Sequence, residues 1–435
     1  MSLRRFPLAA AALLAAGTLL AGCASGSGSG SADADAPSAG PATGEITFWS
    51  SLSGMADVAA AFNASQDDIT VDFEEIPNGA NGGYTKLAAA IESGTGPDVV
   101  GIEYQRLPGF VAAEQLLPLD GLVDEEVLGA YDEQVRGQVS FGDAAYALPY
   151  DAPPLVMWYR QDVLDAAGVD VPTTWDEFEA AARAVKAENP NAYLTSFFTN
   201  EPQLAPLSWQ AGAEWFSVED DHWQVAIDDK ASTKVADYWQ KLIDEDLVKK
   251  QIGFSDEWTA DLNSGVVNGW VGGSWSASGL MTRTEGSGQA GKWVAAVPPT
   301  WDGEPSAALS GGTSFAITEN SENQAAAAVF AEWLTTTEEA VDARGAVGTA
   351  YLAYPGLNEI AAAVAPVDYF ANDIYAVFDE ASANLGAWAW GPNYEITNTA
   401  MKDAVTADPT LGEALVATQD ATVDGLEQLG LDISE

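Results

Sequence analysis

The chain has 435 residues, with 65 acidic side chains against 17 lysines and arginines, which gives a formal net charge of −48. A surface this negative repels nucleic-acid phosphates and anionic lipid headgroups. A function in binding nucleic acid or another polyanion is therefore excluded. About 390 residues follow the first 44, which is too many for one compact core and indicates two domains.

The N-terminus has the pattern of a secretory signal. The pair Arg4-Arg5 precedes an apolar run over residues 6–21, which is shorter than the about 20 apolar residues of a membrane-spanning helix. The run closes with Leu20-Ala21-Gly22-Cys23, which resembles the lipobox of bacterial lipoproteins. The resemblance implies that residues 1–22 are a signal peptide and that Cys23, the only cysteine, carries a lipid anchor. The arginine pair leaves the Sec and twin-arginine export routes both open.

Residues 23–44 are predicted to be a flexible tether on that anchor. The segment is rich in Gly, Ser, Ala, Asp and Pro and has no apolar pattern. A flexible chain of this length spans about 25 Å. Such a tether suits a folded body that captures something outside the cell for a partner in the membrane.

Residues 45–102 are predicted to alternate strands with helices. Residues 45–49 and 69–73 alternate or are β-rich, and 98–102 is a third short apolar run. Between them, Met55, Val58, Ala59 and Phe62 follow helical spacing, as do Tyr84, Leu87 and Ile91. Strand–helix alternation favours an α/β domain with a mostly parallel sheet.

The rest of the chain continues with both kinds of element. Thr174 and Glu177 predict a capping box at the start of a helix whose buried face includes Trp175 and Phe178. Further helices are predicted at 231–246, 322–335 and 410–429, and short strands at 267–271, 293–297 and 313–317.

Eight short motifs, in order along the chain from the lipobox to about residue 318, are similar to those of the extracellular solute-binding proteins of ABC sugar importers. They are Ile46-Thr47-Phe48-Trp49-Ser50, Gly96-Pro97-Asp98-Val99-Val100, Tyr146-Ala147-Leu148-Pro149-Tyr150-Asp151, Met157-Trp158-Tyr159-Arg160, Pro172-Thr173-Thr174-Trp175-Asp176-Glu177, Gly272-Gly273-Ser274-Trp275, Gly311-Gly312-Thr313 and the lipobox. The layout resembles that of maltose-binding proteins.

The resemblance implies two α/β lobes joined by a hinge around an interlobe cleft. Lobe 1 is expected to comprise 45–150 plus 308–355, and lobe 2 is expected to comprise 151–307 plus 356–435. The chain would cross between them near 149–153, 305–312 and 350–370. Prolines restrict the backbone of the first crossing, and glycines give the backbone of the second crossing more conformational freedom.

The function implied is capture of a carbohydrate, expected to be an oligosaccharide, and its delivery to the permease subunits of an ABC importer. We expect a monomer at the extracellular face of the cytoplasmic membrane, with no cofactor, no metal and no enzymatic activity. Two alternatives stay open: the same fold binding a polyamine through carboxylates and cation–π contacts, and a membrane-anchored glycoside hydrolase with paired acids.

Aromatic candidates for the cleft follow from stacking, because a flat indole face matches the C–H face of a pyranose. Trp49 ends the first strand, Trp275 stands where the family resembled has a cleft aromatic, and Trp388 and Trp390 share a side if the chain there is extended. Helical spacing places Trp175, Trp239 and Trp333 in the core, and leaves Trp209, Trp215 and Trp258 undecided.

Polar candidates are groups that can bond sugar hydroxyls. Glu103 follows the third strand and Asp151 lies in the first crossing, and in the family resembled both positions contact ligand. Further donors and acceptors are expected from Ser51, Asn81, Tyr84, Gly312 and Thr313.

Catalytic and metal-binding chemistry has little basis in the residues. His222 is the only histidine, in a polar stretch that predicts a surface turn. One histidine and no free thiol argue against zinc, and no nucleophile-elbow, EF-hand or phosphate-loop motif is present in the folded part.

Overall fold

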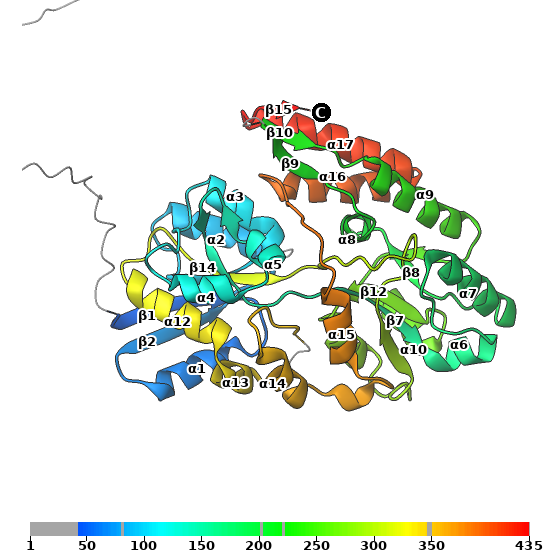
Figure 1. The fold of residues 1–435 in the computed structure, drawn as a ribbon, viewed down its shortest axis with the longest axis horizontal. Coiled ribbons are helices and arrows are strands. Elements are labelled where there is room, and N and C mark those ends of the chain that lie inside the picture. Colours follow the sequence, from blue (N-terminus) through cyan, green and yellow to red (C-terminus); the bar gives the residue numbers. More distant parts are fainter. Residues whose placement is uncertain (1–41, 80–81, 201–202, 220–221, 346–349, 435) are drawn as a thin grey trace, which may run out of the picture. The chain divides into compact units, whose positions relative to one another are not determined.

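The computed structural model describes residues 42–79, 82–200, 203–219, 222–345 and 350–434. The signal segment, Cys23, almost all of the tether and Asn81 lie outside the described residues. The described chain is a mixed α/β structure with two lobes (Figure 1).

Lobe 1 is built on a five-stranded sheet of order β2-β1-β3-β14-β6. Its strands, with a small hairpin, are β1 (Gly44–Ser50), β2 (Ile69–Glu75), β3 (Val99–Glu103), β4 (Ser140–Phe141), β5 (Ala144–Ala145), β6 (Ala147–Pro149) and β14 (Thr313–Ile317). Its helices are α1 (Met55–Ser65), α2 (Gly83–Glu92), α3 (Leu107–Ala112), α4 (Glu125–Ala130), α5 (Glu133–Gly137), α12 (Gln324–Thr336) and α13 (Glu338–Arg344). The next helix, α14 (Leu357–Val364), packs against α13.

Alternation in β1 explains how this sheet packs. Ile46 and Phe48 point into the core and are fully buried, while Trp49 lies on the other face of the strand and is half-buried. The ring of Phe48 meets Phe315 of β14 and Phe330 of α12 with centroids 5.5 and 5.1 Å apart. The strand β1 runs parallel to β2 and β3, as predicted, but β14 is antiparallel to β3 and β6.

Lobe 2 holds three smaller sheets, of order β12-β7-β13, β11-β8 and β15-β10-β9. Its strands are β7 (Leu155–Arg160), β8 (Ser196–Phe198), β9 (Phe216–Glu219), β10 (His222–Val225), β11 (Lys249–Gln251), β12 (Gly269–Gly273), β13 (Trp293–Ala296) and β15 (Ile433–Ser434). Its helices are α6 (Gln161–Ala167), α7 (Trp175–Glu188), α8 (Leu204–Gln210), α9 (Lys230–Asp244), α10 (Asp256–Ser264), α11 (Ser276–Arg283), α15 (Ile374–Ser382), α16 (Tyr394–Thr406) and α17 (Leu411–Gln428).

The helices and strands expected from the sequence are confirmed at each predicted position, with two local corrections. The hydroxyl of Thr174 accepts the Glu177 amide as expected, but the Glu177 carboxylate accepts from the amide and hydroxyl of Thr173, one residue earlier. His222 is exposed, as expected, but it begins strand β10 instead of a turn, and its ring lies 3.1 Å from the Asp432 carboxylate.

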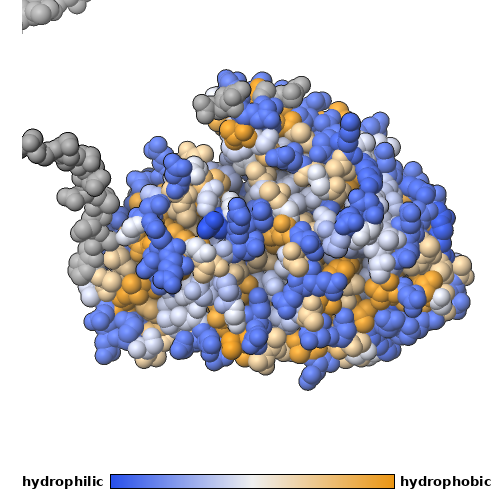
Figure 2. Space-filling view, in the orientation of Figure 1, coloured by the Kyte–Doolittle hydropathy of each residue, from blue (hydrophilic) through white to orange (hydrophobic). Residues whose placement is uncertain are grey.

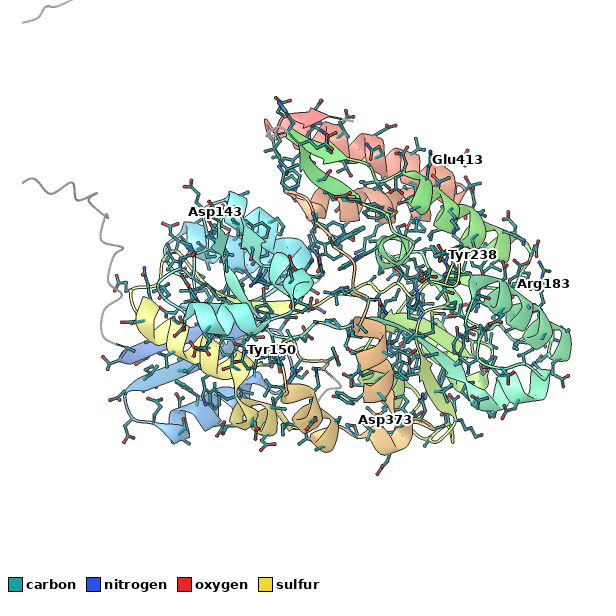
Figure 3. The ribbon with its side chains drawn as sticks, viewed as in Figure 1. Asp143, Tyr150, Arg183, Tyr238, Asp373 and Glu413 are labelled. Carbon is teal, nitrogen blue, oxygen red and sulfur yellow. The ribbon has the colours of Figure 1, made fainter. Side chains whose placement is uncertain are left out.

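The chain passes from one lobe to the other in segments that lie side by side. Residues 150–154 lead from β6 to β7, and 297–312 lead from β13 back to β14. The amide of Ala152 donates to the carbonyl of Tyr351 at 2.8 Å, and the amide of Ser310 donates to the carbonyl of Pro153 at 2.9 Å. Tyr150, labelled in Figure 3, lies at the edge of lobe 1 where these segments begin. The residue limits given above for the lobes stay a prediction.

Candidate functional site

A cavity of about 660 Å³ is lined by residues of both lobes and of the segments that connect them. Its lining comes from the ends of elements: the last residue of β3, the residues after β8 and within β12, the connecting segments, and the start of α16. Figure 2 shows this face of the molecule hollowed between the lobe that carries α3 and the helices α16 and α17.

Aromatic side chains of lobe 2 form one wall of the cavity. The rings of Phe254 and Trp275 are each 37% exposed, and their centroids lie 6.3 Å apart. Trp270 of β12 packs edge-on against both at 5.7 Å. The indole N–H of Trp275 donates to the carbonyl of Ser310 at 2.7 Å, which fixes the ring over the cavity. Large, fixed and half-exposed rings are the surface that a sugar face needs for stacking.

Phe254 adopts a backbone conformation that a bulky side chain rarely takes, with φ of 60°. Gly253 precedes it, and a side chain there would meet the ring of Phe198 at 2.5 Å. Close packing on one side and the left-handed turn on the other thus direct the Phe254 ring into the cavity. Backbone strain of this kind is concentrated at binding sites.

Two carboxylates face the aromatic wall from the lobe 1 side. Glu103 accepts a hydrogen bond from the Tyr84 hydroxyl at 3.0 Å, and that hydroxyl accepts the Glu103 amide at 2.9 Å. Asp151 Oδ1 accepts the Thr313 amide at 2.6 Å, while its carbonyl accepts the Tyr104 hydroxyl at 2.7 Å. Both acids are therefore held in place, Glu103 by a side chain of α2 and Asp151 by the backbone of β14, and can offer further acceptor positions to a ligand.

Burial raises the pKa of both carboxyl groups. Desolvation raises the pKa of Asp151 to about 6, although the Thr313 amide and the charge of Arg344 act in the opposite direction. Desolvation also raises the pKa of Glu103, against the lowering effects of the Tyr84 hydroxyl and of Arg106. The cavity is thus an environment where negative charge is costly.

We expect Asp151→Asn to stabilise the ligand-free protein at pH 7. Between pH 3.8 and about 6 the folded protein binds more protons at Asp151 than the unfolded chain does, so the free energy of unfolding falls as pH rises through this window. The asparagine removes this loss, which is at most about 3 kcal/mol, and its Oδ1 can still accept the Thr313 amide. Urea denaturation at pH 4 and pH 7 measures the change.

Asp143→Asn is the matched control for that measurement. Asp143 is an exposed carboxylate beside the β4–β5 turn and is labelled in Figure 3. The Asp143→Asn substitution removes one negative charge, as Asp151→Asn does, but from an exposed position. It should therefore leave the pH dependence of the unfolding free energy unchanged. Equal effects of the two substitutions would show that net charge, not burial of Asp151, sets the pH dependence.

The structure brings six of the sequence-predicted site residues together around this cavity. They are Glu103, Asp151, Trp275, Gly312, Thr313 and Trp390. Asn81 lies outside the described residues, and the remaining four do not line the cavity.

The four others are placed elsewhere for local reasons. The Trp49 ring lies on the face of β1 opposite Phe48, with the Lys86 ammonium of α2 4.4 Å from its centroid. Ser51 is exposed at the end of that strand. Trp388 is buried, because its ring stacks on Trp209 at 5.1 Å.

Tyr84 supports Glu103 from behind and lines a neighbouring hollow of about 610 Å³. This hollow and the cavity share Gln105 and Tyr394 in their linings. Two further hollows, of about 600 and 370 Å³, lie beside the connecting segments and between α9 and α17. The 370 Å³ hollow has no aromatic residue among its described lining, and the 600 Å³ hollow is lined by Tyr351, Tyr354 and Tyr375 together with acids. We take the 660 Å³ cavity as the site, because it is the largest of these four hollows and lies at the carboxyl ends of β3 and β8, where an α/β sheet places its ligand.

Sequence reasoning missed several lining residues. They include Asn78, Phe198, Asn200, Gln203, Phe254 and Trp270. The strand-end rule that selected Glu103 also applies to Phe198 and Asn200 at the end of β8, so the signal was available there. No comparable signal marks Phe254, because its left-handed backbone is not evident from its residue type.

Within the described ranges, no group of three or more His, Cys, Asp and Glu side chains is arranged to hold a metal ion. No helix among the residues with a described structure is both long and apolar enough to span a bilayer.

Comparisons with known proteins agree on the kind of molecule. Residues 49–341 match the profile of the family described as bacterial extracellular solute-binding protein. A lactose-binding protein of Rhizobium radiobacter is 27% identical over 395 residues, which cover 84% of this chain and 87% of that protein.

Two solved structures share the fold over most of their length. The galacto-N-biose/lacto-N-biose I-binding protein of an ABC transporter from Bifidobacterium longum superposes with a TM-score of 0.81 at 24% identity, covering 91% of this chain and 100% of its own. An ABC transporter associated binding protein from B. animalis subsp. lactis Bl-04, in complex with β-1,6-galactobiose, gives a TM-score of 0.76 at 26% identity, with 90% and 99% coverage. The fold is that of the two-lobed sugar-binding proteins.

Proposed function

Because this chain belongs to the family of bacterial extracellular solute-binding proteins, we propose that it captures an oligosaccharide outside the cell and delivers it to an ABC importer. The single observation that carries the proposal is the cavity, in which half-exposed rings face two carboxylates. Rings stack on the apolar faces of sugars, and carboxylates accept hydrogen bonds from hydroxyl groups.

The size of the cavity agrees with such a ligand. Its volume of about 660 Å³ lies within the ordinary range of small-molecule sites, and two sugar units fit in this space. Lactose and β-1,6-galactobiose, which the two relatives above bind, are of this size and are the first ligands to test.

Ligand binding is coupled to closure in this proposal. The aromatic wall belongs to lobe 2 and Glu103 to lobe 1, so a sugar that contacts both favours the closed arrangement over the open one. The connecting segments that pair at residues 150–154 would act as the hinge. The closed form would then dock on the permease subunits.

The family is extracellular, and we propose that this member is held at the membrane by a lipid on Cys23. The support is the sequence Leu20-Ala21-Gly22-Cys23 after an apolar run. A monomer on the predicted tether of residues 23–44 would reach a neighbouring permease from such an anchor. Mass spectrometry of the membrane fraction should show a diacylglyceryl group on Cys23 and no peptide from residues 1–22.

We expect binding without cleavage. The family consists of binding proteins, and Glu103 and Asp151 are each engaged in supporting hydrogen bonds. Overnight incubation with lactose and β-1,6-galactobiose should return both sugars intact. Release of monosaccharides would instead support the glycoside hydrolase, and displacement of a bound sugar by spermidine would support polyamine binding.

A thermal-shift screen tests the proposed function directly. A ligand at 100 times its dissociation constant should raise the free energy of unfolding by about 2.7 kcal/mol. We therefore expect a higher melting temperature with at least one of a panel that contains lactose, β-1,6-galactobiose and longer neutral oligosaccharides. Sorbitol at equal concentration controls for solvent effects. A panel in which no glycan shifts the melting temperature would contradict sugar capture.

A further inference from the structure

The charged side chains that line the cavity all carry the same sign. Glu103 and Asp151 are present, and no lysine, arginine or histidine lines the cavity within the ranges that the structure describes. The internal gaps at 80–81, 201–202, 220–221 and 346–349 contain no basic residue either. The exposed rings of Phe254 and Trp275 add negative quadrupole potential on the opposite wall. The ligand therefore meets negative potential from both sides.

Positive charge near the cavity lies behind its lining and is already engaged. Three arginines near the cavity already have partners. Arg106 pairs with Glu395. Arg344 donates to the Tyr150 hydroxyl and Arg283 donates to the Thr259 hydroxyl, each at 2.8 Å. The guanidinium of Arg283 also lies 5.4 Å from the Phe254 ring centroid. These cations hold the walls of the site in place, and none presents a bidentate fork to a ligand in the cavity.

We propose that Glu103 and Asp151 make the cavity selective against acidic sugars. The ligand is then a sugar without a carboxylate, sulfate or phosphate group, which specifies the ligand class of the oligosaccharide-binding function proposed above and rests on it. An anionic group in the cavity would lose water without gaining a cation, and it would lie close to two like charges in a medium of low dielectric constant. A neutral sugar instead supplies hydroxyl donors to both carboxylates.

The experiment compares sugars that differ only in charge. Lactose and β-1,6-galactobiose are each oxidised at C6 of the non-reducing galactose, which turns a CH₂OH group into a carboxylate. Isothermal titration calorimetry at pH 7.5 then measures the affinity for each neutral sugar and its acidic counterpart. We expect the acidic form to bind at least tenfold more weakly, both at 0.15 M and at 1 M salt.

The salt series separates the cavity from the surface. The net charge of −48 also repels anions, but at 1 M salt the screening length falls to about 3 Å, so exposed charges act little beyond contact. Discrimination that disappears at 1 M salt would assign the effect to the surface and overturn the proposal. Discrimination that persists places it in the cavity.

Substitutions identify the residues. Glu103→Gln should lower the ratio of the affinity for the neutral sugar to that for the acidic sugar at least threefold. The reason is that the glutamine side chain can still accept the hydrogen bond from the Tyr84 hydroxyl but carries no charge. Glu92→Gln, on the exposed wall of the neighbouring hollow, is the matched control and should leave the ratio unchanged. Asp151→Asn provides a second test that does not depend on the Tyr84–Glu103 pair.

The outcomes separate this inference from the proposed function. If neutral and acidic sugars bind within twofold of each other, sugar capture stands and the selectivity proposal fails. Equal effects of Glu103→Gln and Glu92→Gln would overturn it as well. If no sugar of either charge binds, the proposed function fails and this inference fails with it.

Discussion

Replacing Trp275 with alanine should weaken oligosaccharide binding at least tenfold. The indole is 37% exposed at the cavity wall, and its N–H bond to the Ser310 carbonyl holds it in position. Stacking that removes roughly 100 Å² of apolar surface from water contributes about 2.5 kcal/mol before costs. Losing this contact corresponds to a factor of up to about 70 in the dissociation constant. Isothermal titration calorimetry with the sugar found in the thermal-shift screen measures the change.

The folded state should tolerate the substitution, because the ring is a wall of the site and not part of the core. We expect the free energy of unfolding without ligand to fall by about 1 kcal/mol, the loss of one ordinary hydrogen bond. Trp275→Phe keeps a flat ring and should restore part of the affinity. An alanine variant that binds as tightly as the parent would remove Trp275 from the site.

Trp49→Ala is the matched control. Trp49 is also a half-buried indole, near the end of β1, but its ring lies beside Lys86 of α2 and does not line the cavity. The affinity of this variant should stay within twofold of the parent. A loss as large as that of Trp275→Ala would mean that the site extends along lobe 1.

The sequence was sufficient for the elements and for the fold, because both depend on periodic burial. Met55, Val58 and Phe62 lie on one face of α1 at the spacing that marked them as helical, and all three are buried. Likewise Val99 and Val100 form the buried strand that ends at Glu103. The residue at which a strand ends can be predicted from the local sequence pattern alone. This pattern therefore predicts that Glu103 lies at the cavity, although it contains no information about lobe 2.

The aromatic wall could be predicted only in part, because it depends on contacts between distant segments. An extended chain would place Trp388 and Trp390 on the same side, yet Trp388 stacks on Trp209 of α8 while Trp390 lines the cavity. Nothing in the residues around 388 shows that α8 will lie there. In the same way, the exposure of Phe254 depends on its left-handed backbone and on the neighbouring Phe198 ring.

The cavity and the connecting segments are built from the same residues. Asp151 lies in the first connecting segment and lines the cavity, while Thr313, whose amide it accepts, follows the second. The Tyr104 hydroxyl bonds the Asp151 carbonyl, and the Tyr104 amide bonds the Gly312 carbonyl at 3.0 Å. A change at this junction should therefore affect stability and ligand affinity together.

Gly312→Ala should be strongly destabilising. The glycine has φ of 120°, and a Cβ atom there would lie 2.4 Å from the ring of Tyr104 and 3.3 Å from the Asp151 carbonyl oxygen. The backbone conformation costs an alanine about 1–2 kcal/mol, and forcing a methyl group into packed atoms costs about 1–3 kcal/mol more. We expect the free energy of unfolding to fall by about 3 kcal/mol or more in urea denaturation, with weaker sugar binding in the fraction that folds.

Gly303→Ala separates the two causes. Gly303 also has a positive φ, of 88°, but a Cβ atom there meets no atom within 4 Å. It should therefore lose only the backbone contribution and keep its affinity for sugar. Adding Tyr104→Ala to Gly312→Ala opens the space that the methyl group needs, so the double variant should be more stable than the sum of the single effects predicts. Strict additivity would show that the Tyr104 ring is not the obstacle, and the link between this junction and the cavity would then have to lie elsewhere.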